Sequence, residues 1–485
     1  MTPAHPFPLS TPEEQGVPPR ALLAFLEKLD AMAQLHGLVI QRHGKTILQA
    51  SWKPYDAKTP HHLFSLSKSF VSCAVGLAIQ EGLLRLDQTL GELFPREASQ
   101  PGVSPLAKQA TLRNLLTMRA GQASCHLGPF LFHPTSQTLV ERYLQVPMAT
   151  RPGEAFVYNS GSTYMLSAAL QKATGQTVAE YLQPRLFTPL GIHSPRWLSC
   201  PNGIPLGGWG LYLTLEELSR FTRLIADHGQ WEGRQLLPPD YLREATSFQS
   251  DNSINGNRDW DCGYGYQFWQ CSHPGAFRGD GAFGQYAIVV PDYDLAITTQ
   301  AGMPEMGRLL FALWDDFLPA LHGTPLPPDP DASQALAEKT ARLEVPRPQG
   351  AYQGAAPGGH YRLEENPLGF QELQCEFQGG GGRLTLVRNG KAHPLEFRYG
   401  DWSRCQAPGL YDAHTPMGGE LALSAAWETP SVLLLHTAFL NEPTLGKFRL
   451  DFQEGQVDIT RDFNHWFLYG PDDMHIRCRG HRLPS

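Results

Sequence analysis

Residues 63–70 read Leu63-Phe64-Ser65-Leu66-Ser67-Lys68-Ser69-Phe70, and an apolar run continues from them to about Glu81. The run is long enough for a helix, so Ser65 and Lys68 are expected on one face of its first turn. A serine hydroxyl is a weak nucleophile until a neighbouring base takes its proton. A buried lysine can be that base, because burial disfavours its charged form. The stretch therefore predicts a nucleophile and its base at the start of a helix.

The pair alone carries little weight. Ser-x-x-Lys occurs by chance in many chains, and a helix cap followed by a solvated lysine would look the same. Ser67 and Ser69 offer the same hydroxyl, and only the spacing to Lys68 favours Ser65. The free N–H groups and positive dipole of a helix N-terminus would favour an oxyanion there. Two further segments add to this prediction.

The second segment precedes another helical stretch and reads Pro152-Gly153-Glu154-Ala155-Phe156-Val157-Tyr158-Asn159-Ser160-Gly161-Ser162. Tyr158 could share the proton transfer with Lys68, although an isolated tyrosine is more often a half-buried aromatic side chain. The third segment leads into a strand and reads Phe277-Arg278-Gly279-Asp280-Gly281-Ala282-Phe283-Gly284-Gln285-Tyr286. Glycines at a strand start permit close backbone approach to a ligand. A free N–H there could complete an oxyanion hole with the N–H of Ser65.

In this order the three segments resemble the serine β-lactamase and penicillin-binding-protein superfamily, and most closely its class C and family VIII esterase-like branch. The resemblance runs over residues 18–321 and includes residues 111–117 with Gly121, and residues 207–212. It implies Ser65 as the acyl-forming nucleophile, Lys68 as its base and Tyr158 as a proton shuttle. It also implies oxyanion donors from the backbone of Ser65 and Ala282, and substrate-binding positions at Ser160, Gly279 and Gly281. No metal and no organic cofactor is implied.

Two departures from the family pattern bear on the substrate. The second motif is usually Tyr-x-Asn, and Ser160 stands here in place of the asparagine. The third motif usually opens with lysine or histidine, and Gly279 stands there. Those cations help to hold the carboxylate of penicillins and D-Ala-D-Ala peptides. An uncharged ester or amide therefore fits this sequence better, unless Arg278 turns its charge toward the site.

The rest of the pattern predicts an α+β, β-lactamase-like domain over residues 1–322. An antiparallel sheet flanked by helices would be built from both ends of this stretch, with a helical subdomain inserted between them. The supporting signals are a helix after Pro18-Pro19 (Leu22, Leu26, Leu29, Ala33), hairpins at 38–48 and 286–299, and helices after Ser162, after Thr214 and over 306–321. Gly175 and Gly229 are expected to end the helices that follow Ser162 and Thr214.

Residues 323–349 are proline-rich and predict an interdomain linker. Residues 350–485 then alternate short apolar runs with glycine turns and predict a small all-β domain. Asn389-Gly390 is a strong hairpin signal within it. The large aromatic side chains of this tail are expected in its core: Trp402, Trp427, Trp466 and Phe467.

Composition excludes several classes of function. The 485 residues carry a formal net charge of −8, so nucleic acid is not an expected partner. Residues 1–19 lack a signal-peptide pattern, and no run is apolar enough for a membrane helix. The eight cysteines are scattered without zinc-ligand spacing, which favours reduced thiols in a cytoplasmic protein. His61-His62 is not expected to bind a metal ion. The pair has no partner motif, and adjacent residues of an extended segment point to opposite sides. The oligomeric state stays open.

The sequence thus predicts a serine hydrolase that acts through an acyl-enzyme on small carboxylic esters or amides, with a small-molecule substrate as its partner. Two alternatives remain. One is a β-lactamase or a D-amino-acid peptidase. The other is a non-hydrolytic sensor or binder, similar to a penicillin-binding protein, that keeps Ser65 but releases the acyl group slowly.

Overall fold

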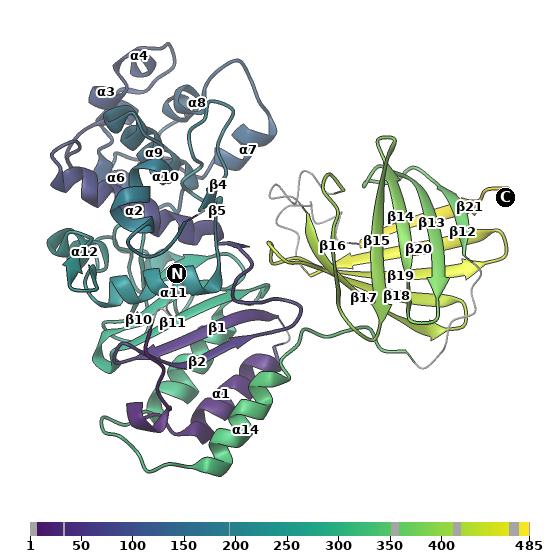
Figure 1. The fold of residues 1–485 in the computed structure, drawn as a ribbon. Coiled ribbons are helices and arrows are strands. Elements are labelled where there is room, and N and C mark those ends of the chain that lie inside the picture. Colours follow the sequence, from purple (N-terminus) through teal and green to yellow (C-terminus); the bar gives the residue numbers. More distant parts are fainter. Residues whose placement is uncertain are drawn as a thin grey trace.

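The computed structural model describes residues 7–32, 34–193, 195–350, 358–410, 419–464 and 475–484. The chain forms a larger part of mixed helix and sheet, followed by a smaller barrel of strands (Figure 1). The β-lactamase-like part and the all-β tail agree with the prediction, and the closure of the tail into a barrel is a finding of the structure. Of the residues named above, Ala33, Trp466 and Phe467 lie outside the described residues.

A six-stranded antiparallel sheet forms the centre of the larger part. Its order is β2 (Lys45–Ser51), β1 (Leu35–Arg42), β11 (Leu295–Ala301), β10 (Gln285–Val290), β9 (Phe277–Gly281) and β8 (Trp269–Gln270). The pairing of β1 with β11 joins segments more than 250 residues apart, as expected for a sheet built from both ends. Every residue of β1 is buried, because helices cover both faces of the sheet.

One face of the sheet packs on α1 (Pro19–Asp30), α13 (Gly307–Ala312) and α14 (Pro330–Ala341) (Figure 1). Proline at the start of α1 and buried Leu22, Leu26 and Leu29 agree with the prediction. Residues 306–321 are not one regular helix, because α13 passes into a π-helical turn over Leu313–Phe317 and a 3-10 turn over Leu318–Ala320. The segment 323–349 contains α14, which docks on α1.

The other face packs on α11 (Leu215–Ala226), which begins with the predicted capping box of Thr214 and Glu217. This helix ends at Ala226 and not at Gly229, because the backbone of Asp227 already leaves helical geometry. Gly229, at φ +85°, instead turns the chain into a short hairpin of β6 (Gln230–Trp231) and β7 (Arg234–Gln235).

The inserted subdomain is mostly helical and surrounds α2 (Ser67–Gln80), which is buried from Ser67 through Ala78. Helix α9 (Ser160–Thr174) packs beside α2 and ends at Gly175, as predicted, but it begins two residues before Ser162. The other elements of the subdomain are short: β3 (His61–His62), α3 (Leu90–Leu93), α4 (Pro95–Ala98), α5 (Pro105–Gln109), α6 (Leu112–Leu116), α7 (Leu127–Phe132), α8 (Leu139–Gln145), α10 (Val178–Leu182), β4 (Arg196–Trp197), β5 (Leu211–Leu213) and α12 (Pro239–Ala245).

In the part of the tail that the structure describes, ten strands form the C-terminal barrel: β12 (Gly359–Leu363), β13 (Phe370–Gln378), β14 (Gly381–Arg388), β15 (Lys391–Tyr399), β16 (Ser403–Gln406), β17 (Glu420–Thr429), β18 (Val432–Phe439), β19 (Leu445–Gln453), β20 (Gln456–Phe463) and β21 (His475–Arg482). A short parallel pairing of β15 with β17 closes the sheet on itself. Asn389 and Gly390 both have positive φ at the predicted hairpin turn. Trp427 is buried in the barrel core, whereas Trp402 is half-buried and packs against the larger part.

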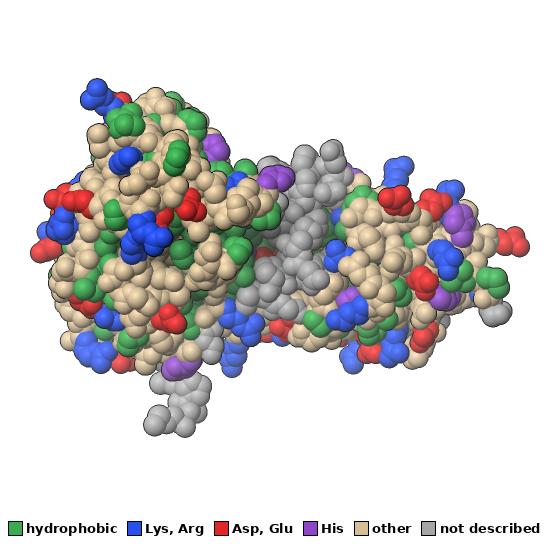
Figure 2. All heavy atoms as spheres, turned by 90° about the horizontal axis from the view of Figure 1, so that it is seen from above, with side chains coloured by type: hydrophobic (Ala, Val, Ile, Leu, Met, Phe, Trp, Pro, Cys, Tyr) green, Lys and Arg blue, Asp and Glu red, His purple; other side chains and the backbone are tan. Residues whose placement is uncertain are grey.

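The barrel also shares apolar contacts with the larger part. Ala422, Ala438 and Leu440 of the barrel belong to the same core cluster as Trp52 and Met303. On the surface, basic and acidic side chains are interspersed over both parts (Figure 2). Within the described residues, no helix is both long and apolar enough to cross a membrane.

Candidate active site

Ser65 lies in a 3-10 turn, η2 (Phe64–Leu66), directly before α2. It is the one residue of 61–70 that is not buried. Ser67, by contrast, is buried and holds the turn, because its Oγ donates to the Phe64 carbonyl at 2.6 Å and accepts from Leu211 N at 3.1 Å. The Ser69 hydroxyl is also buried and donates to the Gln267 carbonyl at 2.9 Å. Of the three serines at 65, 67 and 69, the geometry therefore leaves Ser65 as the one whose hydroxyl contacts Lys68.

Lys68 is a buried amine, 1% exposed, with three oxygen neighbours. Its Nζ lies 2.9 Å from Ser65 Oγ, 3.0 Å from Ser160 Oγ and 2.7 Å from the Gly208 carbonyl oxygen. Burial lowers the pKa of Lys68 to about 7, although negative charge near it opposes the shift. A neutral amine here can donate to Gly208 and Ser160 and accept the proton of Ser65. The contacts thus suit a base.

Tyr158 packs over the same amine. Lys68 Nζ lies 4.7 Å from the centre of its ring, and the Ser65 side chain is near enough to the phenol to lower its pKa slightly against the effect of burial. The ring is also 5.2 Å from Trp269 and 6.2 Å from Tyr264 between centres. Burial raises the pKa of Tyr158 above its usual value of 10, so the phenol is protonated at neutral pH. A protonated tyrosine can donate a proton but cannot be the first base.

At the start of α9, the Asn159 side chain caps the helix and the Ser160 side chain contacts Lys68. The Asn159 side chain caps the helix by accepting from Gly161 N at 2.8 Å, and it donates to Gln122 Oε1 at 2.7 Å. It is buried and serves the backbone. Ser160, at the position where the family usually has asparagine, directs its hydroxyl to Lys68.

Strand β9 lies against the turn that carries Ser65. A Cβ added to Gly279 would meet Leu66 Cδ1 at 2.2 Å, and one added to Gly281 would meet the Leu63 carbonyl oxygen at 2.1 Å. Both glycines therefore permit close packing of β9 on η2, whether or not substrate also contacts them. Ala282, next along the chain, is partly exposed and accepts from Gln285 Nε2 at 3.1 Å through its carbonyl. The structure brings the segments of Ser65 and Ala282 together, and their oxyanion role stays a prediction.

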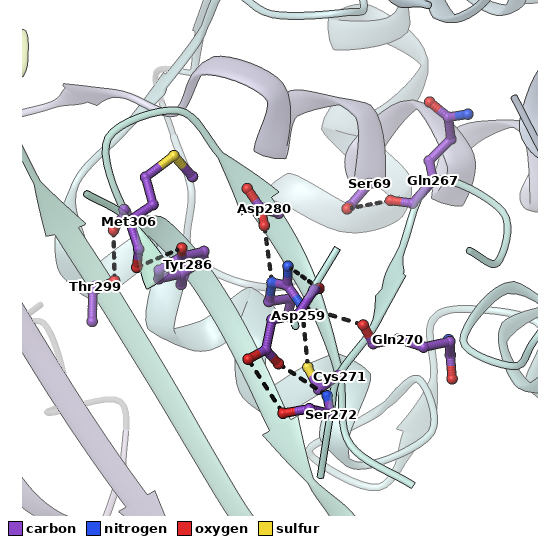
Figure 3. Close-up of polar contacts among 12 residues, drawn as sticks. Ser69, Asp259, Gln267, Gln270, Cys271, Ser272, Asp280, Tyr286, Thr299 and Met306 are labelled. Carbon is purple, nitrogen blue, oxygen red and sulfur yellow. Dashed lines mark hydrogen bonds and ion pairs between the residues drawn. The ribbon is translucent and has the colours of Figure 1, made fainter. Parts of the chain in front are cut away.

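Arg278 does not offer its charge to the site, because it is paired with Asp280 and with two backbone carbonyls. Its partners Asp259, Gln270 and Asp280 are labelled in Figure 3. Arg278 is fully buried, and its Nε donates to Asp280 Oδ2 at 2.9 Å. Its two terminal nitrogens donate to the carbonyls of Asp259 at 2.8 Å and Gln270 at 3.3 Å. Burial raises the pKa of Asp280, and the guanidinium opposes that rise. The two charges balance one another inside the protein.

Non-glycine residues with positive φ gather around this site. Phe64 (φ +47°), Met118 (φ +57°), Gln267 (φ +66°) and Phe283 (φ +68°) all belong to segments that contact Ser65, Ser69, Tyr158 or Ala282. Such conformations are unfavourable for side chains of this size and concentrate at functional sites.

Sequence reasoning missed one contact of Lys68. Gly208 had been noted only as part of the resemblance over residues 207–212, yet its carbonyl makes the shortest hydrogen bond to the amine. A Cβ on Gly208 would meet Ser160 Cβ at 2.7 Å. The density of glycines in Gly207-Gly208-Trp209-Gly210 was the available signal for a close backbone approach.

The described part of the chain contains no cluster of three or more histidine, cysteine or acidic side chains suited to a metal ion. His61 and His62 do point apart. His61 Nε2 lies 3.0 Å from His36 Nδ1, and His62 Nδ1 lies 3.0 Å from Glu442 Oε2.

Comparison with known proteins adds the following. The sequence profile of the beta-lactamase family matches residues 24–301. Lovastatin esterase of Penicillium rubens is 27% identical over 168 residues, which is 30% of this chain and 42% of the relative. Monacolin J acid methylbutanoyltransferase of Aspergillus terreus is 27% identical over 158 residues, which is 29% of this chain and 38% of the relative. The chain spans about half the length of the first curated relatives it matches.

Among solved structures, a hydrolase with promiscuous acyltransferase activity, EstCE1, is similar in fold. It aligns with a TM-score of 0.50 at 17% identity and covers 61% of this chain and 99% of its own.

Proposed function

The chain belongs to the beta-lactamase family, and on that premise we propose that it is a serine hydrolase that forms an acyl-enzyme at Ser65. The proposed substrates are small uncharged carboxylic esters, followed by amides. The catalytic unit would be residues 1–322, joined through residues 323–349 to the β-rich domain of residues 350–485.

One observation carries the proposal: the buried Lys68 amine, with a pKa of about 7, lies 2.9 Å from Ser65 Oγ. In the first step the neutral amine takes the Ser65 proton as Oγ attacks the ester carbonyl carbon. The carbonyl oxygen becomes an oxyanion, which the N–H groups of Ser65 and Ala282 would stabilise. Collapse of this intermediate expels the alkoxide and leaves the acyl group on Ser65.

Tyr158 would supply the proton that the leaving group needs. Its raised pKa keeps it protonated, and its ring lies over the Lys68 amine that contacts Ser65, which supports this role. Lys68 can then return the serine proton to Tyr158. In the second step water attacks the acyl carbon with the same base, and Ser65 leaves as a hydroxyl.

The substrate class follows from charge. A glycine at position 279 and a fully paired Arg278 provide no cation for a substrate carboxylate at the third motif. The names of two relatives support acyl chemistry of this kind: one is an esterase and the other transfers a methylbutanoyl group. β-Lactams and D-amino-acid peptides rank lower, because they carry the carboxylate for which this motif lacks a partner.

Hydrolysis of a short p-nitrophenyl ester by wild type and Ser65→Ala tests the proposal, with a chromogenic cephalosporin in parallel. We expect ester turnover in wild type, none above background in Ser65→Ala, and an intact cephalosporin. Equal turnover in both proteins would contradict the assignment of the nucleophile. A stable acyl adduct by intact mass, without product, would instead favour the non-hydrolytic binder.

A further inference from the structure

Glu442 belongs to the barrel, yet its side chain is buried against the catalytic part. It lies in the turn between β18 and β19 and is 1% exposed. Its carboxylate contacts His62 Nδ1 at 3.0 Å and accepts from the Tyr212 hydroxyl. The neighbouring Asn441 accepts from His62 N at 2.9 Å and donates to the Pro60 carbonyl at 2.7 Å. This turn therefore attaches to strand β3, three residues before Ser65.

Both partners of the carboxylate can donate a hydrogen bond. Burial and the adjacent carboxylate raise the pKa of Tyr212 well above its usual value, so its hydroxyl keeps its proton. His62 Nε2 has no hydrogen-bond partner among the described residues, so Nδ1 makes the side-chain hydrogen bond of the ring, as a donor to Glu442. Hydrogen bonds to a carboxylate are stronger than those between neutral groups. Glu442 thus fixes the orientation of two aromatic rings.

The His62 ring lies between two other rings. It stacks on Tyr212 at 4.6 Å with planes 9° apart, and on Phe64 at 3.9 Å with planes 29° apart. Phe64 immediately precedes Ser65 and has φ +47°. An aromatic residue adopts this conformation only where its surroundings hold it. The stack on His62 is such a support.

Phe64 also contacts the second predicted oxyanion segment. Its ring meets Phe283 edge to face, with centres 5.3 Å apart and planes at 77°. Phe283 immediately follows Ala282 and has φ +68°. Two aromatic residues in the left-handed region therefore flank the two predicted oxyanion donors, Ser65 and Ala282, and pack on each other.

We infer that Glu442 is a positioning residue for the oxyanion hole. Through His62 and the contact of Phe64 with Phe283, the barrel sets the orientation of the N–H groups of Ser65 and Ala282. This inference rests on the proposed function. Oxyanion donors act only at short range from the developing charge, so a small rotation of either backbone lowers the rate without changing how substrate binds.

The test compares full-length wild type with Glu442→Ala, Glu442→Gln and Arg404→Gln. Arg404 is a matched control, because it is also a barrel side chain that contacts the catalytic part, at Asp56 and the Pro54 carbonyl, away from η2. Each protein is assayed for kcat and KM with the p-nitrophenyl ester, and for the rate of Ser65 labelling by a fluorophosphonate. The phosphonyl oxygen of that probe occupies the oxyanion position in its adduct.

We expect Glu442→Ala to lose about tenfold or more in kcat and in labelling rate, with KM within about twofold of wild type. Glu442→Gln should retain part of both, because its amide oxygen still accepts one of the two hydrogen bonds. Arg404→Gln should match wild type. Circular dichroism establishes that each variant is folded.

Wild-type kcat and labelling in folded Glu442→Ala would overturn the inference, as would an equal loss in Arg404→Gln or a change in KM alone. If Glu442→Ala does not fold, Glu442→Gln decides, and wild-type rates there would overturn the inference. Failure of the proposed function looks different: wild type itself would then show no more turnover or labelling than Ser65→Ala.

Discussion

At the scale of single residues, the site turns on the protonation of Lys68. Its pKa of about 7 is lowered chiefly by burial, and only the neutral amine can accept the Ser65 proton. The fraction of Lys68 that is neutral falls as the pH drops below about 7, and deprotonation of Lys68 is complete well above that pH. Activity should therefore require a pH near or above neutrality.

For an uncharged ester, kcat/KM should rise about tenfold per pH unit below pH 7 and level off above it. A profile from pH 5 to 9 checks this expectation. Lys68→Arg is the paired variant, because guanidinium keeps its proton over the whole range and should abolish the rising limb along with most of the activity. A wild-type profile that is flat from pH 5 to 9 would contradict Lys68 as the base.

Tyr158→Phe should affect substrates according to their leaving groups. An alkoxide or an amine must be protonated as it departs, whereas p-nitrophenolate leaves readily without a proton. Loss of a general acid should therefore cost about a hundredfold or more in kcat on an ethyl ester and much less on a p-nitrophenyl ester of the same acid. Parallel assays of both esters measure this ratio, and equal losses on the two would argue for a purely structural role of the phenol.

The residue scale also shows what local sequence can reveal. Ser65 and Lys68 are three positions apart, and the spacing predicted their contact. Ser65 lies not in the first turn of α2, where it was expected, but in the 3-10 turn that leads into it. The Gly208 carbonyl acts through the backbone, which no side-chain pattern records. The burial of Arg278 against Asp280 depends on how β9 packs, so its direction could not be read from the sequence.

At the scale of elements, the approach of β9 to η2 explains the third motif. Gly279 leaves no space for a side chain, because Leu66 Cδ1 would lie 2.2 Å from its Cβ. The lysine or histidine usual in the family would require the side chains of Leu66 and Ser69 to shift. The glycines predicted a close approach, and the structure identifies the neighbour as the turn that carries Ser65.

Gly279→Ala should therefore lower the free energy of unfolding by about 1–3 kcal/mol, as overpacking in a buried site does. Gly323→Ala is the matched control, since a Cβ there meets nothing within 4 Å. Urea titrations of both variants against wild type measure the difference. If Gly279→Ala is as stable as Gly323→Ala, β9 does not pack on η2 as closely as the distance from Gly279 to Leu66 indicates.

At the scale of the whole molecule, the sequence predicted two parts and a linker between them, but not the contacts that the two parts make with each other. The alternation of strands and turns predicted an all-β tail, yet no local pattern signals the parallel pairing of β15 with β17 that closes it. Glu442 and His62 are 380 positions apart, and nothing near either residue signals the other. Contacts of this kind depend on the finished fold, which is why the positioning role of Glu442 emerges only from the structure.

Shared contacts should make the two parts unfold together. Ala422, Ala438 and Leu440 of the barrel lie in the core of the sheet, and Glu442 satisfies two buried groups of the catalytic part. Calorimetry of wild type should therefore give a single thermal transition. Glu442→Ala leaves the Tyr212 hydroxyl and His62 Nδ1 without their acceptor, at about 1–3 kcal/mol each, and should split that transition into two. Arg404→Gln removes only partly exposed contacts and should keep one transition. Two well-separated transitions in wild type would mean that the barrel folds independently of the catalytic part.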